Sequence, residues 1–421
     1  MIFLNLAFKS LKNRAFATSL TVLSISLSVM LLLGVEVAQR AAREGFTQTI
    51  SKTDLIVGAR SGSLQLLLYS VFNMGSPTHN VSYETYEKIK NHPAIAWTIP
   101  YSLGDGHRGF RVVGTNGDFF KYYSFRGDEK VAFAVGREFN NLWEVVIGSE
   151  VAQKLDYKLG DQIVVAHGVT KGEGVQHHDH KPFKISGILQ ATGTPLDRSI
   201  YVSLEGVEAL HVDWKNGAAP THGHEMSAEE ISKEHLHVHA ITAFFVGAKS
   251  RIESLKIQRE INEFADEPLM AIIPAVTLNE LWEGLSYAEG VLRLISVLVV
   301  VISFIAMLIA LMTTLNERRR EMAILRAVGA NTQQIGGLLV FESALLSFLG
   351  IVLGVALSLF LMLLLEPWLQ SKFGLYLKDG QFSQREFAYI GGVFVVGTLI
   401  GLIPALSAQK RALKDGLSVR V

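Results

Sequence analysis

Four long runs without a charged side chain dominate the pattern of hydrophobic and polar positions along this chain of 421 residues. The runs are Ala15–Val35, Leu294–Leu315, Ser343–Leu365 and Ala388–Ala408. An α-helix rises about 1.5 Å per residue, so a run of about 21 to 23 residues covers the roughly 30 Å hydrocarbon core of a bilayer. Because soluble helices rarely remain uncharged for about 18 residues, the runs predict four transmembrane helices.

The residues between the first and second runs have an ordinary soluble composition, and their pattern alternates between strand and helix. Short stretches rich in β-branched and aromatic residues predict strands at Ser51–Gly58, Phe110–Gly114, Gln162–Ala166, Phe183–Leu189, Ser199–Val202 and Ile241–Val246. Apolar positions at helical spacing predict helices at Val81–Asn91, Ser149–Leu155 and Ser250–Phe264. The insert is therefore predicted to be a large α+β domain of two subdomains.

The distribution of Lys and Arg predicts which side of the membrane each loop occupies, because short cytoplasmic loops are enriched in these residues. Basic residues precede the first run, separate the second from the third and follow the fourth. They are Lys9, Lys12 and Arg14, then Arg318, Arg319, Arg320 and Arg326, then Lys410, Arg411, Lys414 and Arg420. We therefore predict cytoplasmic termini and an extracytoplasmic α+β domain. A cleaved signal peptide is the alternative for the first run, but its apolar stretch is long and no clear cleavage site follows.

These patterns divide the chain into nine segments. Their predicted bounds are a cytoplasmic amphipathic segment at 1–14, a transmembrane helix at 15–37, the extracytoplasmic domain at 38–287, a second helix at 288–315, a cytoplasmic loop at 316–334, a third helix at 335–365, a short outer loop at 366–386, a fourth helix at 387–408 and a cytoplasmic tail at 409–421.

Composition agrees with a membrane protein and narrows its chemistry. Hydrophobic residues make up 49% of the chain and charged residues 19%, below the roughly 25% that is usual for soluble domains. The 39 Lys and Arg balance the 39 Asp and Glu, so net charge gives no support for a nucleic-acid partner. The chain has no cysteine, which excludes disulfides, thiolate metal sites and cysteine nucleophiles.

The predicted cytoplasmic loop contains a short amphipathic helix. Met322, Leu325 and Val328 recur at helical spacing, charged residues occupy the remaining positions, and Gly329 is a helix-stop signal. The arginines alone would fit a positive-inside anchor, but an apolar face with a charged rim also suits docking into a groove on a partner. We predict that the docking residues are Arg319, Arg320, Glu321, Ile324, Leu325 and Val328.

The apolar regions contain an acid and two close-packing motifs. Glu342 is the single charge in the stretch from Ile335 to Leu365. Intramembrane acids are functional candidates by default, although this one could also snorkel or bond to the arginine-rich loop. Glycines four residues apart let helix backbones approach, a pattern that also arises by chance; they are Gly350, Gly354, Gly397 and Gly401.

The 13 histidines all lie in the predicted outer domain, and nine of them form two loop-like patches. The first contains His167, His177, His178 and His180, and the second contains His222, His224, His235, His237 and His239. Imidazoles beside carboxylates are good ligands for Zn²⁺ and similar cations. The candidate zinc ligands are His177, His178, His180, His222, His224, His235, His237 and His239; the alternative is a solvated, His-rich loop. Neither a HExxH motif nor a nucleophile with a matching base stands out, so an intrinsic enzyme is not indicated.

The chain also lacks the GxxxxGK[ST] phosphate loop, so ATP-dependent work would need an ATPase in another polypeptide. One helix, a large outer domain and three further helices resemble the permease subunits of type VII ABC transporters, the MacB/FtsX/LolC-LolE superfamily. The most specific match is LNERRREMAILRAVGA at Leu315–Ala330, which resembles the coupling segment of that family. Further similar stretches are Phe341–Gly354, IPALSA at Ile403–Ala408, and the outer Val146–Gly160 and Phe183–Leu189. The histidine patches depart from the general pattern.

The resemblance implies a permease of the bacterial inner membrane with a MacB-like periplasmic core domain and no cofactor of its own. Two permease copies, identical or related, would pair with ATPase subunits that bind ATP and Mg²⁺. ATP hydrolysis would then move the periplasmic domain by mechanotransmission, for export or for extrusion of a lipoprotein or other substrate. A periplasmic adaptor or substrate protein is a further expected partner. Two alternatives remain: a regulator of a periplasmic enzyme, and a component of a zinc-handling system.

Overall fold

The computed structural model describes residues 14–167, 178–214, 226–232, 236–317, 329–373 and 382–415. The chain forms two compact units. One contains the long apolar helices, and the other is built mainly from Arg43–Gly284. Each unit has buried apolar clusters of its own.

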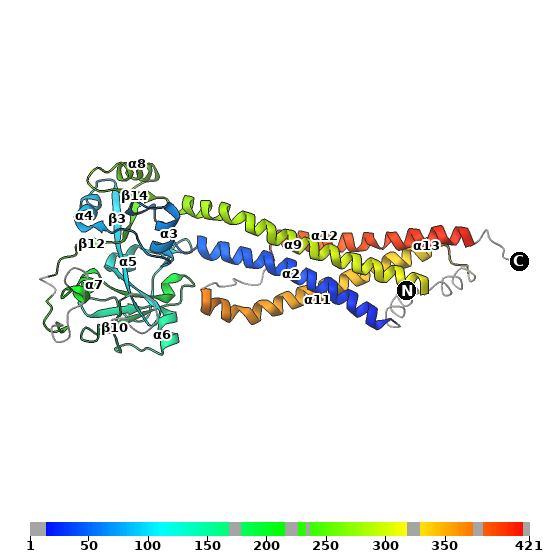
Figure 1. Cartoon of the computed structure of the whole chain (residues 1–421), viewed down its shortest axis with the longest axis horizontal. Coiled ribbons are helices and arrows are strands. Elements are labelled where there is room, and N and C mark those ends of the chain that lie inside the picture. Colours follow the sequence, from blue (N-terminus) through cyan, green and yellow to red (C-terminus); the bar gives the residue numbers. More distant parts are fainter. Residues whose placement is uncertain are drawn as a thin grey trace. The chain divides into compact units, whose positions relative to one another are not determined.

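The helical unit contains long helices that match the four predicted apolar runs. They are α2 (Ala15–Thr47), α9 (Pro274–Glu317), α11 (Thr332–Phe373), α12 (Gln384–Ile400) and α13 (Leu402–Asp415). Four segments are long and apolar enough to cross a membrane, the last of them formed by α12 and α13 together. Figure 1 shows these helices alongside one another, from α2 in blue to α13 in red. Four apolar helices with a large α/β region after the first confirm the predicted fold class.

Apolar side chains on facing sides of these helices form the core of the bundle. Ile25, Val29 and Leu33 of α2 cluster with Met307 of α9 and Leu346 of α11, and all five are nearly inaccessible. Other apolar side chains of the same helices are exposed, which is the arrangement expected where lipid rather than water surrounds a helix. Each helix therefore packs on one side and leaves its other side for the bilayer.

The fourth apolar segment is interrupted near its end. Helix α12 ends at Ile400, Gly401 forms a turn, and α13 begins at Leu402. Pro404 has no N–H group to donate to the Ile400 carbonyl, and its ring crowds that oxygen. The proline therefore explains an interruption four residues before it.

The α/β unit is organised around a large mixed sheet. Within the described residues its strands run in the order β14-β1-β13-β3-β4-β11-β8-β10-β7, and β9 pairs with β10. The bounds of these strands are β1 Leu55–Ala59, β3 Ile95–His107, β4 Phe110–Thr115, β7 Phe133–Gly136, β8 Glu144–Ile147, β9 Gln162–Ile163, β10 Phe183–Leu189, β11 Ser199–Ser203, β13 Ala243–Ala248 and β14 Leu269–Ile272.

Short strands and helices complete the unit. The helices are α3 Ser63–Val71, α4 Tyr83–Lys90, α5 Gly117–Tyr122, α6 Ser149–Leu155, the 3₁₀ turn η1 Pro195–Arg198, α7 Leu204–His211 and α8 Arg251–Asn262. Two-stranded ladders join β2 Val81–Ser82 to β12 Ala240–Ile241, and β5 Ser124–Phe125 to β6 Glu129–Lys130. Buried apolar side chains gather in separate clusters on the sheet, so both of its faces are covered.

Strand β3 connects the two halves of the large sheet. Its first part pairs antiparallel with β13 and its second part with β4. The register with β4 shifts between Leu103 and Gly106, which marks a β-bulge at Gly104 and Asp105. A bulge bends a strand and changes the direction of its side chains, so this irregularity decides where Asp105 points.

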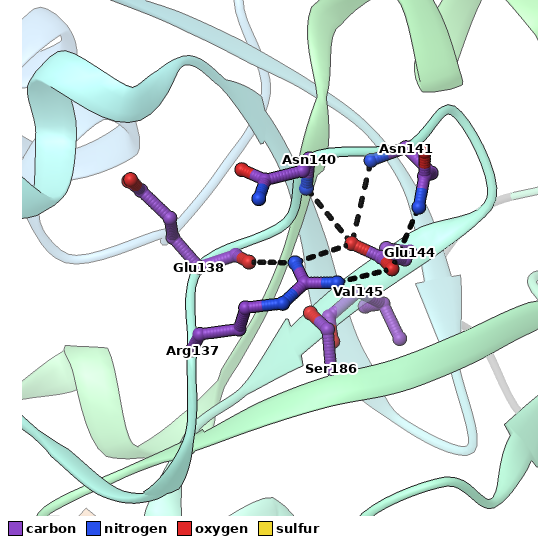
Figure 2. A network of polar contacts seen from close by, with 7 residues as sticks. All are labelled: Arg137, Glu138, Asn140, Asn141, Glu144, Val145 and Ser186. Atoms are coloured by element: carbon purple, nitrogen blue, oxygen red, sulfur yellow. Dashed lines mark hydrogen bonds and ion pairs between the residues drawn. The ribbon is translucent and has the colours of Figure 1, made fainter.

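A polar network fixes the connection between β7 and β8. Both Glu144 oxygens accept hydrogen bonds from the Arg137 guanidinium at 2.8 Å, and backbone N–H groups of Asn140 and Asn141 donate to the same carboxylate (Figure 2). The Arg137 hydrogen bonds, supported by those of Asn140 and Asn141, lower the pKa of Glu144 to about 2. The ionised carboxylate therefore holds the loop that leads into β8.

Candidate functional site

The predicted docking residues Arg319, Arg320, Glu321, Ile324, Leu325 and Val328 lie outside the residues that the structure describes. The description resumes at Gly329, whose φ of 97° is a conformation that glycine adopts most readily. Asn331 then precedes α11, and its carbonyl accepts hydrogen bonds from Gln334 and Ile335. The docking role of the segment stays a prediction.

Glu342 lies on α11 and is 2% exposed. The adjacent Ser343 is fully buried, and its hydroxyl lies 2.8 Å from the Val340 carbonyl and 3.2 Å from the Thr398 carbonyl of α12. The acid therefore occupies the packed part of α11, where this helix approaches α12. A position inside the bundle is where intramembrane acids usually serve a function.

The four predicted packing glycines lie at helix contacts, two on α11, one on α12 and one in the turn that follows α12. A Cβ atom at Gly350 of α11 would come within 2.6 Å of Ile25 of α2, and one at Gly354 would lie 2.7 Å from the Ser26 carbonyl. A Cβ at Gly397 of α12, or at Gly401 in the turn after α12, would collide with serines of α11. These helix pairs approach closely because no side chain separates their backbones.

Two ion pairs join α2 to its neighbours next to the apolar core. Arg40 Nη1 lies 2.9 Å from Glu386 Oε2 at the start of α12, and Arg293 Nη2 of α9 lies 3.3 Å from Glu36 Oε2. Glu386 is fully buried, and its carboxylate also accepts a hydrogen bond from the Ser383 backbone. These pairs fix α2 against both α9 and α12.

The predicted zinc ligands do not share one environment. His177, His222, His224 and His235 lie outside the described residues, and His180, His237 and His239 are exposed. His178 is the exception, since only 8% of it is accessible. Of the four predicted ligands that the structure describes, one is therefore buried and three are exposed to solvent.

His178 belongs to a cluster around the buried Asp105 that sequence reasoning did not identify. Asp105, His178 and His211 each offer a ligand atom, and these atoms all lie within 4.8 Å of one another. His167 Nδ1 lies 3.2 Å from Asp105 Oδ1, and His211 Nε2 lies 3.6 Å from the same oxygen. Asp105, His167, His178 and His211 are called the Asp–His cluster below. Asp105 and His211 carried no sequence signal, because each stands apart from the histidine patches.

Three elements bring the Asp–His cluster together. The bulge in β3 carries Asp105, and an antiparallel bridge between Gly106 and Ala166 places His167 beside it. The His178 backbone N–H donates to the Val165 carbonyl at 3.0 Å, which brings His178 to the same place. His211 is the last residue of α7.

Burial and charge set the protonation of two histidines in the cluster. Burial lowers the pKa of His178 to about 4, so its imidazole is neutral near pH 7. The Asp105 carboxylate raises the pKa of His167, which is partly exposed. The Trp214 ring lies 4.9 to 5.7 Å, centroid to centroid, from the three imidazoles and borders the cluster.

Comparison with known proteins identifies both units. The MacB-like periplasmic core domain family matches residues 18–261, more than half of the chain, and the FtsX-like permease C-terminal family matches residues 293–417. An uncharacterized ABC transporter permease of Methanocaldococcus jannaschii is 25% identical over 96% of this chain and 94% of its own length.

Two solved structures match part of the chain more loosely. The periplasmic region of MacB from Actinobacillus actinomycetemcomitans is 10% identical, with a TM-score of 0.35 over 55% of this chain and 94% of that chain. The extracellular domain of the noncanonic ABC-type transporter YknZ from Gram-positive bacteria is 14% identical, with a TM-score of 0.31 over 52% of this chain and 99% of that one. On the strength of the sequence matches, the chain belongs to the FtsX-like permeases that carry a MacB-like periplasmic core domain.

Proposed function

We propose that this chain is the membrane subunit of an ABC transporter of the MacB/FtsX type. In this role it couples ATP hydrolysis by a separate ATPase subunit to movement of its periplasmic domain. The two family matches support the proposal, as does the relative that is named an ABC transporter permease. The chain has no phosphate loop in its sequence, so the energy must come from a partner.

The observation that carries the proposal is the length of α2 and α9. Helix α2 continues from its apolar run to Thr47, and α9 begins at Pro274, well before its apolar run starts at Leu294. At about 1.5 Å per residue, these extensions add roughly 18 and 30 Å of continuous helix. A continuous helix transmits displacement along its axis better than a flexible loop would, so both helices suit the transfer of motion.

Contacts between the two extensions support this role. Within the helical unit, Gln39 Nε2 lies 3.4 Å from the Glu289 carbonyl, and Arg293 pairs with Glu36. Within the α/β unit, the Trp282 ring meets Phe46 edge to face at 5.8 Å, and the Arg43 guanidinium lies 5.3 Å from that ring. The extensions of α2 and α9 therefore contact each other, as expected of two helices that transmit motion together.

In the proposed arrangement, Arg319–Val328 lie in the cytoplasm as the ATPase-docking helix, and the α/β unit lies in the periplasm. A second permease copy, identical or related, would complete the transporter in the inner membrane. A periplasmic adaptor or substrate protein would receive the motion. In the alternative function, the regulation of a periplasmic enzyme, α2 and α9 would transmit the same motion to a different partner.

The docking helix is tested by changing its two faces separately. We expect Leu325→Glu to remove apolar contacts and the double variant Arg319→Glu/Arg320→Glu to reverse the charged rim. Either change should reduce recovery of the ATPase subunit with the purified permease by about 10-fold or more, since a loss of about 1.4 kcal/mol is a tenfold change in affinity.

The control is Arg251→Glu, a single charge reversal at an exposed position in α8 of the other unit. It should leave ATPase recovery and permease-stimulated ATP turnover unchanged. If the Leu325 and arginine variants retain the ATPase as fully as this control, the docking assignment is wrong.

A further inference from the structure

The Asp105 carboxylate is buried without the hydrogen bonds that such a group needs. Its residue is 2% exposed, and neither carboxylate oxygen accepts a well-aligned hydrogen bond from the described residues. Burying an ionised carboxylate costs several kcal/mol unless a proton, a cation or several donors compensate its charge. His167 Nδ1, 3.2 Å from Oδ1, is one positive partner when it is protonated, and Oδ2 has no hydrogen-bond partner within the described residues, so a bound cation would complete the compensation.

The His211 imidazole presents a lone pair rather than a donor toward Asp105. His211 Nδ1 lies 3.2 Å from the Val207 carbonyl, and a carbonyl only accepts, so Nδ1 carries the proton and Nε2 of the neutral ring is bare. His211 Nε2 and His178 Nε2 are both buried and unpartnered within the described residues. A metal-bound histidine usually donates one ring N–H to a group such as a backbone carbonyl and binds the metal through its other nitrogen.

The frame around the Asp–His cluster is held in place by further contacts. Lys181 Nζ donates to the Leu210 carbonyl at 2.9 Å and lies 2.7 Å from Asp213 Oδ1, and both Lys181 and Asp213 are largely buried. This pair ties the turn that follows His178 to the end of α7, which carries His211. The Asp213 carboxylate is occupied by Lys181, so Asp105 is the acid that remains for a cation.

We propose that Asp105, His178 and His211 bind a divalent cation of the Zn²⁺ class, with His167 available as a fourth ligand. Nitrogen and carboxylate donors at four positions suit Zn²⁺, whereas Mg²⁺ and Ca²⁺ prefer oxygen alone. Bonds of about 2.0 to 2.2 Å place tetrahedral ligand atoms roughly 3.3 Å apart. The 3.6 Å between His211 Nε2 and Asp105 Oδ1 is close to that spacing, and the ligand atoms, all within 4.8 Å of one another, would draw together around the ion.

Metal binding at this site does not depend on the proposed ATP coupling. The cluster lies wholly in the α/β unit, and the docking residues lie outside it. Loss of the metal would leave the docking proposal intact, and failure of ATPase docking would leave the metal site intact. The exposed His180, His237 and His239 of the two patches are not part of this cluster.

The test is a titration of the purified full-length chain with Zn²⁺ alone, in competition with a colorimetric chelator. We expect one site per chain with a dissociation constant of about 1 µM or lower. Asp105→Asn and His211→Gln should each weaken that site about 100-fold or more, since each removes a ligand. Co²⁺ in the same site should give the strong visible absorption of a four-coordinate ion, and both variants should lose it.

Two control variants test whether the tight Zn²⁺ site is the Asp–His cluster rather than other histidines of the chain. The first is His92→Gln, a histidine on the same unit that pairs with Glu260 at 3.2 Å, away from the cluster. The second replaces the patch histidines His177, His180, His222, His224, His235, His237 and His239 by glutamine. Both controls should keep the tight site and the Co²⁺ spectrum.

Wild-type affinity in both Asp105→Asn and His211→Gln would overturn the proposal, as would loss of the tight site in the patch variant alone. The absence of any site tighter than about 10⁻⁴ M in the wild type would also overturn it. Circular dichroism of each variant shows whether it is folded, and His178→Gln replaces any variant that is not.

Discussion

Two carboxylates of the α/β unit, the partly exposed Glu144 and the buried Asp105, differ in the hydrogen bonds that they receive. Glu144 receives hydrogen bonds from a guanidinium, two backbone N–H groups and an amide, whereas Asp105 accepts none with good geometry from the described residues. A fully bonded carboxylate stabilises the fold, whereas a buried one without donors calls for a further explanation. The contrast separates a structural acid from the acid of the proposed metal site within one sheet.

Glu144 gives a pH-dependent contribution to stability with a definite sign. Its folded-state pKa of about 2 is below the ordinary value of 4.5, so its contribution is complete above pH 4.5 and is lost as the pH falls toward 2. We expect the thermal midpoint of the full chain to fall in that window. Glu144→Gln should remove part of this fall and lower stability at pH 7 by roughly 1 kcal/mol, a modest value because the Arg137 partner is half exposed.

Glu138→Gln is the matched control, because Glu138 is an exposed acid in the same loop and uses only its backbone carbonyl in the network. It should melt like the wild type at every pH. A Glu144→Gln protein with the same acid transition as the wild type would show that this carboxylate does not contribute to the acid sensitivity.

Among the elements, glycines decide how closely the transmembrane helices approach. The sequence predicted the GxxxG pairs, but only the structure shows which helix each pair faces. Gly350 and Gly354 lie against α2, whereas Gly397 and Gly401 lie against α11. Other glycines of the same helices have open space around them, so the spacing motif alone does not reveal a contact.

A pair of glycines on α12 offers a sharp comparison. Gly397→Leu should force α12 away from Ser347 of α11 and lower the thermal stability of the detergent-purified chain by about 1 to 3 kcal/mol, the usual cost of overpacking. Gly392→Leu changes a glycine of the same helix where an added Cβ atom would meet nothing within 4 Å, so it should leave the stability nearly unchanged. Equal melting of the two variants would contradict close packing at Gly397.

Strand β3 shows why local pattern underestimates some elements. The segment Ile95–His107 contains a proline and two glycines, and such residues argue against a strand when only sequence is considered. In the fold, β13 and β4 pair with its two halves and the glycines lie at the bulge. Tertiary pairing therefore overrides propensity at the position that aims Asp105.

For the whole molecule, the main expectation is that the α/β unit and the docking segment lie on opposite sides of the membrane. The absence of cysteine makes this directly measurable with single-cysteine variants. Asp128→Cys lies at an exposed turn of the α/β unit, and Gln333→Cys lies at the exposed start of α11. In spheroplasts, a membrane-impermeant maleimide should label the first variant, and it should label the second only after lysis.

The cysteine-free wild type is the background control for labelling. Equal labelling of Asp128→Cys and Gln333→Cys in intact spheroplasts would place both positions in one compartment. That result would exclude the proposed orientation, together with the cytoplasmic location of the docking residues.

The sequence by itself determined the membrane helices and the insertion of the α/β region between the first two. The reason is solvation, because long apolar helices are stable in lipid and leave a readable one-dimensional pattern. Only the tertiary structure decided that Asp105 and His211 meet His178, since these residues lie far apart in the chain and a β-bulge, a strand bridge and a helix end bring them together. A cluster built from long-range contacts has no local pattern, so the spacing of histidines could single out His178 but not the acid beside it.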